Sequence, residues 1–124
     1  MAGTITCGTL SDGTNSTSST NCIQGSAKAW VNFNGVPAIL IIRASYNVSS
    51  VTKTTTGAWV VNLTNALVDI NYVTLACGAT TFQTAGYNSM WDATPITSST
   101  FAVNSTTNSG GPGDRGVVCA AAFR

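Results

Sequence analysis

The sequence contains no histidine and no glutamate, and only 7% of its 124 residues carry a charge. Five Lys or Arg residues and four Asp residues give a formal net charge of +1. Without histidine, the common Ser-His-Asp and Cys-His nucleophiles are absent. Five scattered cations cannot form the continuous basic surface that neutralises nucleic-acid phosphates, so we expect no nucleic-acid partner.

Long hydrophobic runs are missing as well. The apolar run ILII at 39–42 is far shorter than the roughly 20 residues that cross a bilayer, so we expect no membrane insertion. The first residues, MAGTITCGTL, have neither a basic leader nor an apolar stretch, and we expect no secretory signal.

The sequence also lacks the usual ligand sets for metal ions. Its acidic residues do not have the spacing of a calcium-binding loop, and its cysteines form no CxxC pair. We therefore expect no metal and no cofactor. In a reducing compartment the four cysteines would be free thiols that serve as small apolar side chains, with a Cys7–Cys22 disulfide as the alternative. They are Cys7, Cys22, Cys77 and Cys119.

What the sequence does contain is a series of short, β-branched segments, several of which alternate apolar and polar residues. No segment shows a convincing helical period. The pattern predicts an all-β fold, a small β-sandwich of jelly-roll type, over residues 27–124. Residues 1–26 are polar and rich in turn residues, which indicates an extended N-terminal arm for attachment. The expected strands are 28–33, 38–47, 48–53, 58–63, 71–78, 99–105 and 116–123.

The run at 39–42 is apolar on both faces of a strand, and each face requires cover. One face can pack on the opposing sheet of the sandwich. The other face predicts contact with another copy of the chain, whereas a monomeric sandwich with an accidental apolar run is the alternative. The side chains that we expect at this subunit interface are Trp30, Ile39, Ile41, Tyr46 and Trp59.

Five stretches of the chain form a recognisable series of motifs: AKAWVNFNG, IIRASYNVSSVT, TGAWVVNLTNAL, INYVTLACG and the closing VVCAAAFR. Together they resemble a family of bacteriophage tail-fibre and related virion-structural proteins. The loop at 54–57 is Thr-rich where that family often has Asp-Asn-Gly, and VDINY at 68–72 replaces its usual Asp-Ala-Asn-Tyr. The resemblance implies a homotrimeric β-rich knob on the virion surface, without cofactor or catalysis.

On this basis we expect a tail-fibre or spike knob that takes part in host attachment and is held to other virion proteins through its arm. A capsid decoration protein without receptor binding is the alternative. Small polar residues mixed with aromatics are suited to binding surface glycans or proteins, although the same aromatics could close the end of the sandwich. The candidate receptor contacts are Phe82, Tyr87, Asn88, Trp91 and Asp92.

A glycosidase would require a pair of carboxylates. The carboxylates of this chain lie in Gly-, Asn- or Thr-rich contexts, where Asp usually caps or bends the backbone. We therefore expect no catalytic residue, with a pair assembled across a subunit boundary as the alternative. The four residues concerned are Asp12, Asp69, Asp92 and Asp114.

Overall fold

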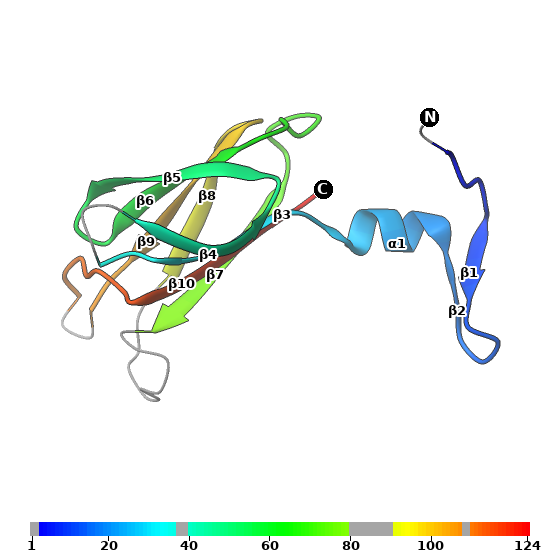
Figure 1. Ribbon diagram of the computed structural model, residues 1–124, viewed down its shortest axis with the longest axis horizontal. Helices are drawn as coiled ribbons and strands as arrows, with labels where there is room; N and C mark the ends of the chain where they lie inside the picture. The colour runs from blue at the N-terminus through cyan, green and yellow to red at the C-terminus, as the bar shows by residue number, and fades with distance from the viewer. Residues whose placement is uncertain (1–2, 37–39, 80–90, 108–109) are drawn as a thin grey trace.

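The computed structural model describes residues 3–36, 40–79, 91–107 and 110–124. Figure 1 shows a two-layered β-sandwich with a narrow N-terminal arm that leaves it along the long axis of the molecule. The expectation of an all-β sandwich is confirmed. The described residues include no helix that is long and apolar enough to span a membrane.

Eight strands form the sandwich, in two antiparallel sheets of four (Figure 1). The first sheet has the order β4-β3-β10-β7 and the second has the order β5-β6-β9-β8. The chain crosses between the sheets after β4, β6, β7 and β9. The strands are β3 (Ala27–Asn34), β4 (Ile41–Tyr46), β5 (Val48–Thr55), β6 (Ala58–Leu63), β7 (Val73–Ala79), β8 (Trp91–Thr97), β9 (Thr100–Ser105) and β10 (Val117–Phe123).

The core lies between the two sheets and follows directly from residue alternation. In β3, β6, β9 and β10 every second residue is buried, because successive side chains of a strand point to opposite faces. Phe33 and Trp59 meet edge to face at the centre, with ring centroids 5.7 Å apart. Gly35 passes directly over the Trp59 ring, where a Cβ atom would come within 2.6 Å of it.

The arm contains more regular structure than the sequence suggested. A small hairpin of β1 (Thr9–Ser11) and β2 (Ser16–Ser18) leads into the helix α1 (Ser19–Gly25). Ser18 caps this helix, because its Oγ accepts a hydrogen bond from the backbone N–H of Asn21. The helix corrects the prediction of a chain without helical segments. At seven residues it is too short to display an apolar period in the sequence.

Strand β8 also differs from the prediction, which had no strand between 78 and 99. Pro95 and the small polar residues around it weaken the strand signal. The structure accommodates Pro95 because β8 is an edge strand, where a missing N–H leaves no ladder bond unmade inside the sheet.

The run at 39–42 does not form an inner strand as expected. Strand β4 begins at Ile41, lies at the edge of the first sheet, and has every residue exposed. Leu40 packs against the core, whereas Ile41 remains largely open to solvent. Ile39 lies outside the described residues. The apolar run therefore has less cover from the opposing sheet than a central strand would have, because β4 is at the margin of the sandwich.

Candidate self-association surface

The outward side of the first sheet is apolar across all four strands. Its central row joins Tyr46, Trp30, Ala121 and Leu75, which are register partners on β4, β3, β10 and β7. The adjoining row joins Ala44, Asn32, Cys119 and Cys77 in the same order. We call the outward side chains of these two rows, with Arg43 bonded to Asn32 and with Val73 and Phe123 of the next row, the outer sheet face.

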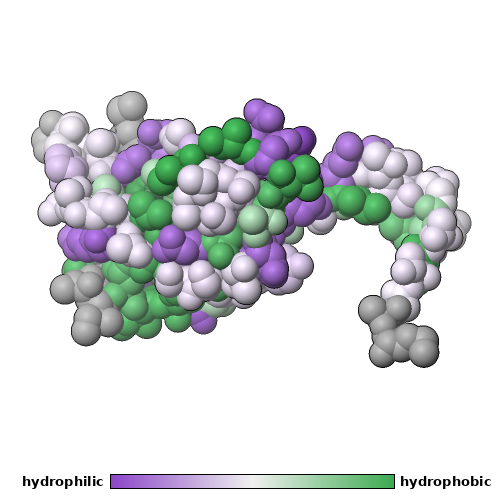
Figure 2. All heavy atoms as spheres, turned by 90° about the horizontal axis from the view of Figure 1, so that it is seen from above, coloured by the Kyte–Doolittle hydropathy of each residue, from purple (hydrophilic) through white to green (hydrophobic). Residues whose placement is uncertain are grey.

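Large apolar side chains of this face are open to solvent. Leu75 is 60% exposed and Trp30 is 40% exposed, and Tyr46 and Val73 are also exposed. The small side chains of Ala121, Ala44 and the two cysteines, together with Trp30 and Leu75, line a shallow hollow of about 690 Å³. Figure 2 shows hydrophobic residues at the surface of the body and, separately, on the arm.

The outward side of the second sheet has the opposite character. Its rows contain Ser50 beside Asn62 and Thr94 beside Ala102, and Asp92 beside Asn104. The amide of Asn62 donates to Ser50 Oγ at 3.1 Å and lies 3.3 Å from Thr52 Oγ1. This sheet therefore follows the ordinary rule of an apolar inner face and a polar, hydrated outer face. The first sheet is apolar on both faces.

The few polar groups on the outer sheet face bond to one another. Arg43 lies beside Asn32, and its guanidinium donates to Asn32 Oδ1 at 3.1 Å and to the carbonyl oxygen of Gly116 at 2.7 Å. The Asn32 amide is 3.3 Å from Cys119 Sγ. Burial raises the pKa of the Cys119 thiol, and the adjacent Cys77 adds to this effect. Cys119 therefore stays a neutral thiol and keeps the face uncharged at this point.

The expected subunit-interface residues lie in three different settings. Trp30, Ile41 and Tyr46 are exposed on the first sheet, as an interface would require. Ile39 lies outside the described residues. Trp59 is 1% exposed and packs on Phe33 inside the sandwich, so its assignment to a subunit interface is wrong. Its place in β6 puts it on the inward side, with Val61 and Leu63.

Sequence reasoning missed the contribution of β7 and β10 to this face. In β7 the larger residues Val73 and Leu75 alternate with the smaller Thr74 and Ala76, a pattern that predicts the larger ones inside. The structure has them outside and Thr74 inside, where its Oγ1 donates to the carbonyl oxygen of Ala93 across the sandwich at 2.6 Å. The sequence of β7 therefore contains no signal for this orientation, since its alternation by itself predicts the opposite one.

Of the candidate receptor contacts, Phe82, Tyr87 and Asn88 lie outside the described residues. Trp91 begins β8, and the structure describes its backbone position alone. Asp92 is exposed on the polar outward side of the second sheet, where its carboxylate accepts a hydrogen bond from Thr94 Oγ1 at 3.0 Å. The structure thus separates Asp92 from the outer sheet face by the full thickness of the sandwich.

Three of the four carboxylates stabilise turns or ion pairs. Asp12 accepts from the backbone N–H groups of Asn15 and Thr14, which lowers its pKa. Asp69 is bonded by Arg124 and by the N–H of Asn71, and its pKa is also lowered.

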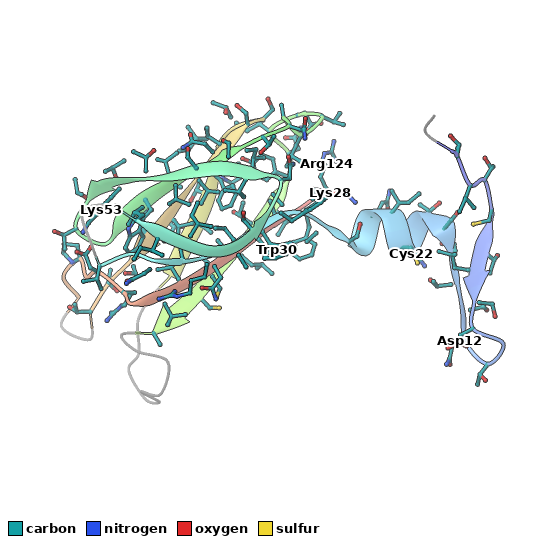
Figure 3. All side chains as sticks on the ribbon, viewed as in Figure 1. Asp12, Cys22, Lys28, Trp30, Lys53 and Arg124 are labelled. Atoms are coloured by element: carbon teal, nitrogen blue, oxygen red, sulfur yellow. The ribbon has the colours of Figure 1, made fainter. Side chains whose placement is uncertain are left out.

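Asp114 pairs with Lys53 at 2.5 Å and accepts from the N–H of Gly57. Burial opposes the charge of Asp114, yet these two donors hold its pKa below the usual range. Figure 3 shows Lys53 at the end of the body that is remote from the arm and Arg124 at the arm end. The two ion pairs therefore lie at opposite ends of the sandwich.

The cysteines do not form a metal site or a disulfide in the described residues. All four are free thiols, and no group of three or more potential metal ligands occurs in the part of the chain that is described. Cys7, Cys22 and Cys77 are exposed, and Cys119 is half-buried. Cys77 and Cys119 are cross-strand neighbours on the outer sheet face.

The feature that distinguishes this sandwich is therefore an extended apolar surface, opposite a polar one. Comparison with protein-family models, with curated protein sequences and with solved structures finds no match to this chain, so its own geometry and sequence are what bear on its function.

Proposed function

We propose that this protein is a structural component of a bacteriophage virion, assembled as a homotrimeric tail-fibre or spike knob that takes part in host attachment. The virion assignment rests on the resemblance of the five sequence stretches to phage fibre proteins, and the outer sheet face is the observation that supports self-association. A monomer with this face open would expose Trp30, Tyr46, Val73 and Leu75 to water together. Contiguous exposed apolar patches of this kind usually mark interaction sites.

Charge supports self-association over association with a charged partner. The chain has a net charge of +1, so copies of it repel one another weakly. Its outer sheet face has Arg43 as a charged group, and that guanidinium is bonded to Asn32 and Gly116. A second copy brings apolar surface of its own, and a closed ring of copies can cover the outer sheet face of each chain.

A sandwich with one apolar and one polar outer face also suits a protein that is displayed on a particle. With the outer sheet face turned toward sister chains, the second sheet faces outward with Ser, Thr and Asn side chains and Asp92. Such a neutral polar surface can form many hydrogen bonds with glycans or with protein epitopes. Three copies on one particle would strengthen a weak contact through avidity.

The carboxylates support a role without catalysis. Asp12, Asp69 and Asp114 are each bonded to backbone N–H groups or to a cation, and each has a lowered pKa. A general acid requires the opposite shift. We therefore propose a binding and structural protein whose partners are copies of itself and the host surface.

Sedimentation velocity over a hundredfold dilution series tests the assembly. We expect a trimer that dissociates on dilution, together with a thermal midpoint that rises with protein concentration. A folded species that sediments as a single chain at every concentration, with a constant midpoint, would contradict the proposal.

The alternative of a capsid decoration protein is favoured by one observation. The arm carries exposed apolar residues and projects from the body, as a segment that docks on a shell would do (Figure 1). Immunogold labelling of purified particles distinguishes the two functions. Gold at the tail supports the fibre or spike, and gold distributed over the head supports decoration.

A further inference from the structure

The arm has an apolar surface but no core. No residue between 3 and 26 is buried. Ile5 is 91% exposed and Ile23 is 64% exposed, and they share one shallow hollow with Leu10, Cys7 and Cys22. We call these five residues the arm patch.

An arm of this kind is not stable by itself. A single two-stranded hairpin is at best marginally stable in water, and helices shorter than about 12 residues are also marginal. Here β1 and β2 have three residues each and α1 has seven, none of them buried. The hairpin and helix therefore require a surface on which the arm patch can pack.

Among the described residues, the arm does not pack on the sandwich of its own chain. Figure 1 shows α1 and the hairpin extending away from the sandwich beyond the start of β3. Lys28 stabilises this exit, because its ammonium donates to Ser26 Oγ at 2.9 Å and to the carbonyl oxygen of Ile23. In Figure 3 Lys28 lies at the junction of arm and body, and Cys22 and Asp12 lie progressively farther out.

We propose that the arm of one copy packs on the outer sheet face of a sister copy, so that the chains of the assembly exchange arms. This inference rests on the self-association proposed above and names the segments that meet. In the described part of the chain, an apolar arm patch and an apolar sheet face both lack cover. Exchange of arms covers the arm patch and the outer sheet face in a single contact.

Shape and charge agree with this pairing. The hollow lined by Trp30 and Leu75 is also lined by small side chains, so it can receive branched side chains such as Ile5 and Ile23. Asp12 is the charged residue of the arm, and the outer sheet face carries Arg43, of opposite sign. Two such faces packed directly against each other would instead bring two Arg43 side chains to the same apolar interface.

The native thiols allow a direct test, because the arm patch contains Cys22 and the outer sheet face contains Cys77. One full-length chain retains Cys22 alone, through Cys7→Ser, Cys77→Ser and Cys119→Ala. A second full-length chain, made distinguishable by a tag, retains Cys77 alone. The two are co-expressed, purified together and treated with a short bismaleimide.

We expect the mixed product, Cys22 of one chain linked to Cys77 of the other, to exceed either like-with-like product several-fold. The matched control is a chain without native cysteines that carries Thr94→Cys, since Thr94 is exposed on the polar side of the second sheet. It should link to the Cys22 chain only at the level of random collision.

Other outcomes overturn the inference in distinguishable ways. Oligomers that link only Cys77 to Cys77 would show that sheet faces pack on each other, and oligomers that link only Cys22 to Cys22 would show the same for arms. Either result refutes the exchange of arms and still supports self-association. If the Cys22 chain links equally to the Cys77 chain and to the Thr94→Cys control, the links reflect collision. Single chains without links contradict both proposals and leave another virion protein as the partner of the arm.

A full-length variant supplies a second readout that needs no thiol. Arm exchange predicts that Ile5→Asp with Ile23→Asp raises the concentration at which the assembly dissociates by about tenfold or more, since a charge would enter an apolar contact. The sandwich itself should keep its circular dichroism, because neither residue contacts the core. Unchanged assembly would refute the exchange of arms.

Discussion

Truncation of Leu75 to alanine should weaken the assembly while leaving the single chain folded. Leu75 is 60% exposed on β7, so most of its side chain contributes nothing to the core of its own chain. Complete burial of a leucine side chain is worth about 1.5–3 kcal/mol. The part of Leu75 that assembly can still cover is therefore worth about 1–2 kcal/mol per chain.

In a trimer this loss occurs three times and sums to about 3–5 kcal/mol. Each 1.4 kcal/mol corresponds to a factor of ten in an equilibrium constant. The trimer dissociation constant of the Leu75→Ala variant should therefore rise by roughly a hundredfold to several thousandfold. Sedimentation velocity on serial dilutions measures it directly, and circular dichroism verifies that the fold is retained.

Ile96→Ala is the matched control. Ile96 is an aliphatic residue of similar size, is 46% exposed, and lies on β8 of the second sheet. Its truncation should leave the dissociation constant within about tenfold of the original value, since surface substitutions usually change the free energy by less than about 0.5 kcal/mol per chain, or about 1.5 kcal/mol for three chains. If both variants dissociate equally, or if Leu75→Ala assembles as well as the original chain, the outer sheet face is not the subunit interface.

Two further predictions concern the stability of the body at a fixed protein concentration. Asn47 has a φ of 54° and its side chain bonds to Lys28 O at 3.0 Å and to Asn65 N at 2.8 Å. Asn47→Ala should lower the free energy of unfolding by about 2–4 kcal/mol in urea titrations, through lost hydrogen bonds and a left-handed backbone. Asn47→Gly should lower the free energy of unfolding by less than Asn47→Ala, because glycine adopts this φ freely. An equal decrease in the two variants would show that the backbone at this position is not strained. Asp114 has a lowered folded-state pKa because Lys53 and the Gly57 N–H outweigh the opposing effect of burial. The contribution of Asp114 to the free energy of unfolding should therefore be complete above about pH 4 and should disappear as the pH falls through the lowered pKa. Asp114→Asn should flatten that part of the pH–stability curve, and an unchanged acid limb would contradict the role of the pair.

The alternation of side chains predicted the body of the fold well. In β3 the buried residues Ala29, Val31 and Phe33 alternate with Trp30 and Asn32, as period two requires. The same rule predicted β6, β9 and β10 closely. It failed where local composition and tertiary position disagree, at β8 with its proline and at β7 with its larger residues outside.

The candidate surface was predicted only in part. The apolar run at 39–42 predicted an inner strand covered on both faces, whereas the structure has Ile41 and Ile42 on the exposed edge strand β4. An edge position cannot be read from such a run, because the pairing with neighbouring strands decides it. Trp59 illustrates the converse case, since an aromatic residue on a strand can face either side and only the pairing with β9 and β5 puts it inside.

The amino-acid sequence by itself determined that this chain forms strands, that its surface is nearly uncharged, and that ordinary histidine-based chemistry is absent. These properties are local or compositional, so they do not depend on which strands become neighbours. The tertiary structure alone decided that Trp30, Ala121 and Leu75, from strands far apart in the chain, lie in one row. A strand pairs through its backbone, and the row that its side chains join is set by register, which no single segment encodes.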